Sequence, residues 1–295
     1  MNDRKLNLIL GWICFLISFI VYYLTAEPTV GFWDTGEYIT TSAKLQVGHP
    51  PGAPLYQMLG AIFSIFAFEK ENIGFIMNLM SGFTSALAIS FMYWSIILIL
   101  KKITDTSEAS INKQILISGS ALVGSLAFAF TDTFWFSAVE TEVYAMATLI
   151  MAVIFYLGLR WEADMHNSRG NKWLLLICFV IGLSFGVHFM GLLVIPAIVM
   201  IYYFKNQKTI LNSTKVNPII GFFIANIIGL GILMGVFKLL LPNTLKFFSA
   251  IELLFVNNLG LPFNSGTLVA FVVIVYAFYF LINYTRKKEI GRAHV

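Results

Sequence analysis

The chain contains 295 residues, 58% of them hydrophobic and only 12% charged, with a mean hydropathy of +0.82. A water-soluble domain of this length could not bury so much apolar surface, so the composition excludes a soluble globular protein. The formal net charge of +4 does not indicate nucleic-acid binding, because the basic residues lie in short clusters at the ends of apolar runs. Several of these runs exceed about 18 residues, the length that crosses a bilayer core, and the sequence therefore predicts an all-α, polytopic transmembrane helical bundle.

Eight apolar ranges are predicted to cross the membrane. In chain order they are residues 6–24, 74–100, 115–130, 143–159, 173–188, 190–204, 216–241 and 267–284. Residues 54–68 are apolar but short, and a span there would put Lys101 and Lys102 on the outside. We therefore expect an interfacial or re-entrant helix over 54–68, within the first external loop.

The basic residues orient these spans. Arg4 and Lys5 precede the first span, which is long and lacks a clear cleavage site, so we expect an uncleaved signal anchor with a cytoplasmic N-terminus. The lysines that then lie on the external side or at outer helix ends are Lys44, Lys70, Lys238 and Lys246, and every other Lys or Arg before residue 289 lies on a cytoplasmic segment. Most of the acids lie instead on the external segments, a distribution that the positive-inside rule does not require.

Residues 1–288 are expected to form one N-terminal transmembrane part. The last seven residues, 289–295 (EIGRAHV), match a translated sequencing-adapter tail and are left out of the fold prediction. We expect the natural protein to continue beyond Lys288.

The first external loop, residues 31–54, contains two acids, Asp34 and Glu37, three positions apart. In a helix this spacing puts both carboxylates on one face. The two acids could form a solvated helix N-terminus, which the helix dipole favours. Alternatively, one of them could be a catalytic base whose proton affinity rises where Trp33 and Tyr38 exclude water. The spacing alone does not distinguish these interpretations.

Two further residues of this loop are candidate binding residues. His49 lies in the rigid sequence GHPPGAP, which is either a turn into the next helix or a support that holds His49 near Asp34. Lys44 could bind a lipid phosphate or simply lie among the headgroups.

Two later segments on the same side of the membrane add polar candidates. Glu140 and Glu142 lie at the start of an inward-running helix, where the dipole favours acids, and they share their side of the membrane with Asp34. His188 lies in SFGVHFMG near the outer end of a span. It is either a satisfied polar residue at a helix hairpin or part of a functional site.

Common catalytic motifs are absent from the sequence. It has no P-loop, GxSxG, HExxH or Cys/His cluster with metal-ligand spacing, and no Asp-x-Asp pair. The last absence argues against a metal-dependent transferase that uses a nucleotide sugar, so a sugar donor would be lipid-linked. No bound cofactor or metal site is predicted, and dependence on a divalent metal stays open.

Three segments carry a resemblance to a known family. The runs WDTGEYITTSAKLQVGHPPGAPLY, AVETEVYA and LSFGVHFMG resemble bacterial GT-C-type membrane glycosyltransferases related to the animal protein O-mannosyltransferase of plexins and receptor kinases. The resemblance implies a GT-C-like fold in a bacterial cytoplasmic membrane, with the active site facing the periplasm or exterior. It also implies that Asp34 is the general base and Glu37 its partner, because such enzymes place an acid of the first external loop at the acceptor.

The resemblance further implies transfer of a hexose such as mannose from a polyprenyl phosphate to a hydroxyl of an exported protein or a glycan. The partners are then membrane lipid, the lipid-linked donor and this acceptor. The candidates for contacts to the donor phosphate or the substrate are Lys44, His49, His188, Glu140 and Glu142. The alternatives are a transporter or flippase for a lipid-linked substrate, without catalytic chemistry, and a structural subunit.

Overall fold

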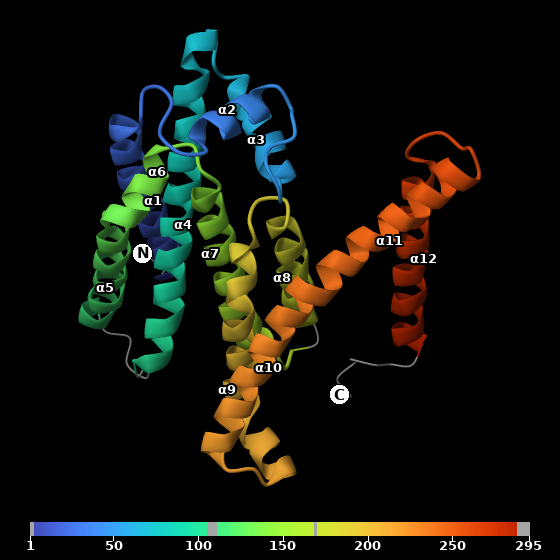
Figure 1. Cartoon of the computed structure of the whole chain (residues 1–295). Helices are drawn as coiled ribbons and strands as arrows, with labels where there is room; N and C mark the ends of the chain where they lie inside the picture. Colours follow the sequence, from blue (N-terminus) through green and yellow to red (C-terminus); the bar gives the residue numbers. More distant parts are fainter. Residues whose placement is uncertain (1–2, 105–110, 168–169, 288–295) are drawn as a thin grey trace.

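The computed structural model describes residues 3–104, 111–167 and 170–287, and every regular element in these ranges is a helix (Figure 1). The all-α prediction is therefore confirmed. The expected adapter-derived tail, residues 289–295, lies outside the described residues.

The helices follow one another with short connections. The α-helices of the described residues are α1 (Asp3–Thr25), α2 (Thr35–Ala43), α3 (Pro54–Ser64), α4 (Ile73–Ile103), α5 (Ile111–Ala129), α6 (Asp132–Val139), α7 (Val143–Asp164), α8 (Asn171–Ser184), α9 (Ile195–Thr214), α10 (Pro218–Gly235), α11 (Leu241–Leu253) and α12 (Ser265–Lys287). Short 3-10 turns, η1 (Lys70–Asn72) and η2 (Phe189–Val194), lead into α4 and α9, and π turns, η3 (Val236–Leu240) and η4 (Leu254–Asn258), flank α11.

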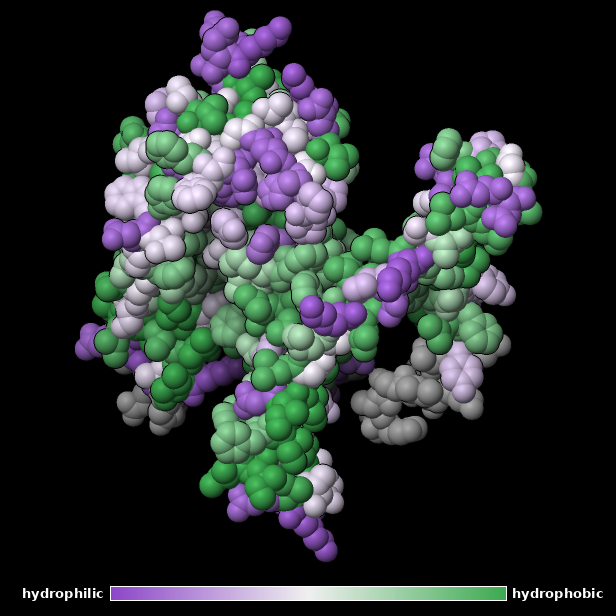
Figure 2. All heavy atoms as spheres, viewed as in Figure 1, coloured by the Kyte–Doolittle hydropathy of each residue, from purple (hydrophilic) through white to green (hydrophobic). Residues whose placement is uncertain are grey.

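Six helical stretches of the described residues are long and apolar enough to cross a membrane. They are Arg4–Thr25, Lys70–Ile103, Val143–Asp164, Phe189–Thr214, Pro218–Asn258 and Ser265–Tyr284. The pair α5 and α6 passes the same test together but is bent by 66°, which would give a seventh, broken span. Hydrophilic side chains gather at the end of the molecule that carries α2 and α3, above a largely hydrophobic surface (Figure 2). The chain is a multi-pass membrane protein, as its composition predicts.

Helix α4 is the centre of the N-terminal bundle and packs against α1, α5 and α7 (Figure 1). Many of its buried positions are small, among them Ser81, Gly82 and Ala86, which lets neighbouring helix backbones approach closely. A Cβ added at Gly82 would lie only 3.2 Å from the Cβ of Tyr22 on α1. This tight packing fixes the outer ends of the helices, where the polar loops meet.

The prediction of eight spans differs from the structure at α8. The predicted range 173–188 is helical only to Ser184, and this helix of 14 residues is shorter than the six candidate spans. Beyond Ser184 the chain forms tight turns, in which the N–H groups of Phe185, Gly186 and Val187 bond to carbonyls three residues earlier. The carbonyl of Gly186 accepts the backbone N–H groups of Leu55 (2.7 Å) and Tyr56 (3.1 Å), at the start of α3.

Residues 242–266, which separate the last two predicted spans, are largely helical. The helical stretch that begins at Pro218 does not end at Leu241 but continues to Asn258, so only residues 259–264 are non-helical. Pro242 lacks an N–H group, and its ring would collide with the carbonyl four residues earlier in a regular helix. The π turn η3 lies directly before Pro242 and widens the backbone there, so the helix passes the proline without ending.

Candidate active site

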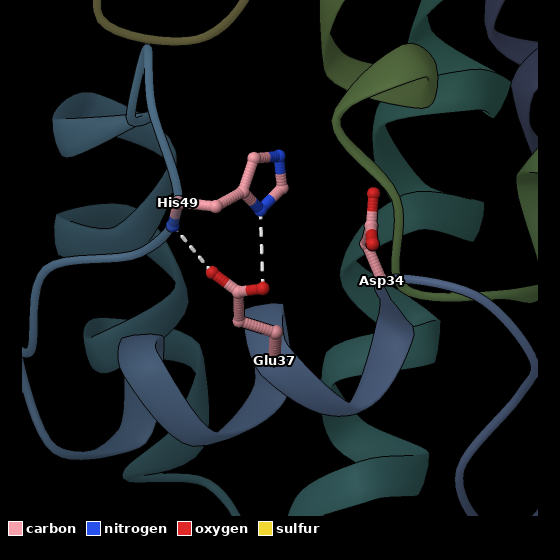
Figure 3. Close-up of side chains that lie close together, drawn as sticks. All are labelled: Asp34, Glu37 and His49. Carbon is pink, nitrogen blue, oxygen red and sulfur yellow. Dashed lines mark hydrogen bonds and ion pairs between the residues drawn. The ribbon is translucent and has the colours of Figure 1, made fainter.

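The first external loop brings three ionisable side chains together at one end of α2. Asp34 directly precedes the helix, Glu37 lies in its first turn, and His49 approaches from the following loop (Figure 3). One potential ligand atom from each of these residues lies within 4.8 Å of the others. Trp33 turns the chain into the helix in a left-handed conformation (φ 60°), and its side chain is 90% exposed.

Glu37 is paired with His49 in this cluster. The Glu37 carboxylate accepts the backbone N–H of His49 (2.5 Å) and lies 3.1 Å from its Nδ1 (Figure 3). These hydrogen bonds lower the pKa of Glu37 and raise the pKa of His49. Gly48 permits the arrangement, because a Cβ there would lie 2.9 Å from Oε1 of Glu37. Glu37 therefore holds the imidazole ring in place.

A backbone contact joins this loop to the segment that carries His188. Pro54 occupies the first turn of α3, and the N–H groups of Leu55 and Tyr56, which have no partner within the helix, donate to the carbonyl of Gly186. A Cβ at Gly186 would lie 2.7 Å from the Cβ of Leu55. Only glycine allows the two chains to approach this closely.

We expect Gly186→Ala to destabilise the protein by about 1–3 kcal/mol, the usual result of adding a methyl group to a packed contact. The matched control is Gly182→Ala, one turn earlier, where an added Cβ meets no atom within 4 Å. Thermal unfolding in detergent should show a lower Tm for Gly186→Ala and an unchanged or slightly higher Tm for the control. Equal Tm values for the two variants would contradict the contact.

Asn78 of α4 ties the first loop to the segment that precedes α7. Its side chain is fully buried, and its amide donates to the backbone carbonyls of Glu27 (2.7 Å) and Thr29 (3.0 Å). Its amide oxygen accepts the hydroxyl of Thr141 (2.5 Å). The backbone N–H of Glu27 also donates to the carbonyl of Val139 (3.0 Å). One side chain thus fixes the distance between the loop of Asp34 and the segment of Glu140 and Glu142.

Two cavities meet at Asp34. The larger, of about 720 Å³, lies against α5, α6 and α7, and the smaller, of about 110 Å³, lies between α2 and the segment around His188. Asp34, Glu142 and Tyr144 line both cavities. His49 and His188 line the smaller one. The structure therefore brings Asp34, Glu142 and both histidines to one place.

Two acids of the larger cavity, Glu140 and Glu142, have raised pKa values. Burial, followed by the negative charge of Asp34, raises the pKa of Glu142 to about 7. Burial and the charge of Glu27 also raise the pKa of Glu140. Near neutral pH, Glu142 is therefore divided between its protonated and ionised forms beside Asp34.

His188 is held in its neutral form. Burial lowers its pKa, and its Nδ1 accepts the backbone N–H of Met190 (3.2 Å). The proton of the neutral ring must then be on Nε2, which leaves one N–H donor. The ring packs edge-on against Tyr144, with 5.3 Å between the ring centroids.

Lys44 lies away from this group. It caps the opposite end of α2, about 15 Å from Asp34 by helix rise, and lines neither cavity. Of the cationic candidates from the sequence, the structure therefore brings His49 and His188 together with Asp34 and leaves Lys44 apart. Asp34, Glu37 and His49 also have the donor types that a divalent cation accepts, although Glu37 and His49 already bond to each other.

Comparison with known proteins bears on this arrangement. The family described as the protein O-mannosyl-transferase TMEM260 N-terminal domain matches residues 34–211, which is more than half of the chain and contains every candidate site residue. The chain belongs to this family. The TMEM260 N-terminal domain match begins at Asp34 itself and ends within α9.

Two relatives are named protein O-mannosyl-transferase TMEM260. The protein from Dictyostelium discoideum is 24% identical over 210 residues, which cover 67% of this chain and 24% of the relative. The protein from Mus musculus is 27% identical over 167 residues, which cover 56% of this chain and 21% of the relative. The chain thus spans about a quarter of the length of these relatives. No solved structure matches it.

Three residues of the site were not among the site residues predicted from the sequence. Asn78 carries a weak signal, since a polar amide in an apolar span needs buried partners. Tyr144 resembles any aromatic residue at a membrane boundary, and its place between the cavities depends on tertiary packing. The role of Gly186 depends on a contact with α3, far away in the sequence, which a local pattern does not reveal.

Proposed function

We propose that this chain is the catalytic membrane part of a GT-C-type glycosyltransferase that transfers a hexose, such as mannose, from a polyprenyl phosphate to a protein hydroxyl. The names of its relatives support protein O-mannosyl transfer. The observation that carries the proposal is the position of Asp34, whose side chain lines both the larger cavity and the smaller one with its two histidines. An acceptor hydroxyl in the larger cavity and a donor phosphate in the smaller cavity would then lie on either side of the Asp34 carboxylate.

Asp34 is the general base in the proposed step. The acceptor oxygen bonds to the anomeric carbon of the sugar while the bond from that carbon to the phosphate oxygen breaks, which inverts the configuration. Asp34 takes the proton of the hydroxyl group, and the polyprenyl phosphate leaves with the bonding electrons. Glu142 adjoins Asp34 and is proposed to contact the sugar or acceptor through its carboxyl group.

The histidines stabilise the leaving phosphate in this proposal. Negative charge grows on the phosphate as the bond breaks, and hydrogen-bond donors already in place lower the barrier. His188 offers its Nε2–H group, and His49, whose pKa is raised by Glu37, offers its Nε2–H group when the ring is protonated. Glu37 acts through His49 as a positioning residue. Lys44 is proposed only as a contact to membrane headgroups.

The distribution of charge supports a site on the extracytoplasmic side of the membrane, which we propose, from the sequence resemblance, to be a bacterial cytoplasmic membrane. The site lies where α4 and α7 have their N-terminal ends, whereas Lys101, Lys102 and Arg160 lie towards the C-terminal ends of the same helices. Basic residues favour the cytoplasmic side, so the cavities belong on the opposite side.

The test supplies two radiolabelled donors to membranes that contain the protein, polyprenyl-phosphate mannose and GDP-mannose, together with an exported protein as acceptor. We expect label on the acceptor from the lipid donor alone. Labelling from the nucleotide donor in membranes stripped of polyprenyl phosphate would contradict the proposed donor. Movement of the lipid donor across vesicles without any labelled protein would instead indicate a flippase.

A further inference from the structure

The larger cavity is strongly acidic. Asp34, Glu140 and Glu142 line it, and its lining includes no Lys, Arg or His among the residues that the structure describes. Three carboxylates facing one cavity repel one another and any anion, so a phosphate is disfavoured there. The smaller cavity shares Asp34 and Glu142 but lacks Glu140 and adds two histidines, so the two cavities differ in chemistry.

Glu140 lacks a counter-charge. Glu140 is only 9% exposed, and its carboxylate forms no hydrogen bond or ion pair within the described parts of the chain. Its carboxyl group lies over Gly31, where an added Cβ would be 2.8 Å from both Cδ and Oε2. A buried carboxylate is costly unless a cation or donor satisfies it. The carboxylate of Glu140 thus lines the cavity with its bonding capacity unused.

Aromatic side chains surround these acids. Trp33 is 90% exposed, Phe136 is 54% exposed and Tyr144 is 47% exposed, and all three line the cavity. Exposed aromatic faces can stack on a guanidinium group or pack on the aliphatic stem of a lysine. A volume of about 720 Å³ is sufficient for a short stretch of polypeptide side chains.

We infer that the larger cavity binds the acceptor polypeptide and selects acceptors that carry Lys or Arg close to the hydroxyl residue. This inference rests on the proposed function. The basic side chain pairs with Glu140, and the neighbouring hydroxyl reaches Asp34 at the boundary with the smaller cavity. Acidic acceptors are repelled by the same three carboxylates.

The first experiment measures transfer to three Ser-containing peptides that differ only in one flanking residue, Lys, Gln or Glu. With the wild-type protein in membranes, the KM of the Lys peptide should be about tenfold below that of the Gln peptide, the ratio given by one charge-assisted hydrogen bond. The Glu peptide should have the highest KM of the three. Glu140→Gln should remove most of this difference by raising the KM of the Lys peptide towards that of the Gln peptide. The matched control is Asp132→Asn, which changes an exposed acid nearby that lines neither of the two cavities.

A second experiment measures binding without transfer. Fluorescence anisotropy of labelled peptides with the detergent-solubilised protein should give the same order of Kd values, and Glu140→Gln should abolish that order. Equal Kd values for the three peptides would overturn the inference, even if transfer occurs and the proposed function stands. Charge-dependent binding without any transfer would support the inference and contradict the proposed function.

The alternative ligand for this group of carboxylates is a divalent cation. Titration with MnCl2, with EDTA as the control, tests it directly. One bound ion per chain that is lost in Glu140→Gln, with no preference among the peptides, would show that the carboxylates hold a metal and would overturn the inference.

Discussion

Replacing Asp34 by Asn should reduce sugar transfer by a factor of roughly 10²–10⁴, the range expected when a positioned general base is removed. Asparagine keeps the size of the side chain but cannot accept the proton of the attacking hydroxyl group. Because Asp34 lies at the boundary of both cavities, its loss should affect kcat rather than the KM of either substrate. Single-turnover transfer from polyprenyl-phosphate mannose in membranes measures this effect.

Three further variants show whether the effect is specific to Asp34. Asp132→Asn changes an exposed acid at the start of α6 and should leave transfer unaltered. Glu37→Gln should lose less activity than Asp34→Asn, because it loosens His49 without removing the base. Full activity in Asp34→Asn together with a large loss in Glu142→Gln would move the role of base to Glu142.

Asn78→Leu should lower the free energy of unfolding by about 3–5 kcal/mol. The leucine is similar in volume but leaves two backbone carbonyls and the hydroxyl of Thr141 without their buried partner. The loop that carries Asp34 would then be free to shift relative to Glu142, so transfer should fall as well. Thermal unfolding in detergent, together with transfer assays well below the Tm of the variant, separates the two effects.

Ser85→Ala is the matched control for this prediction. Ser85 lies on the same helix and is fully buried, but its hydroxyl has no hydrogen-bond partner among the described residues. Its replacement should change stability by less than about 1 kcal/mol. If both variants unfold at the same temperature, the hydrogen bonds of Asn78 do not hold the two segments together.

Local patterns in the sequence predicted much of the fold. Composition and the length of the apolar runs indicated an all-α membrane protein, and most expected spans coincide with helices. The predicted span ends at Leu241 whereas the helix continues, because proline is a strong helix-ending signal and the π turn that accommodates Pro242 has no simple pattern. The predicted range 173–188 extends beyond α8, into a segment whose Gly186 carbonyl makes a tertiary contact with α3.

The candidate site was predictable in its residue types but not in its pairings. The spacing of Asp34 and Glu37 predicted two acids at one end of a helix, as the structure has them. Their partners depend on chain segments far apart in sequence. Glu37 pairs with His49, and Asp34 meets Glu142 across a boundary that Asn78 fixes from α4. Tertiary packing creates these neighbours, so periodicity and spacing could not reveal them.

The uninterrupted helix from Pro218 to Asn258 is too long for an upright crossing. Its 41 residues extend about 60 Å at 1.5 Å per residue, about twice the thickness of the hydrocarbon core. It must either incline by about 60° from the bilayer normal or extend along one surface of the bilayer. Figure 1 shows α10 and α11 running obliquely to α4 and α12. In either case, this helix acts as a lateral spacer, so α12 enters the lipid away from the N-terminal bundle. The position of α12 relative to the N-terminal bundle should then change with bilayer thickness.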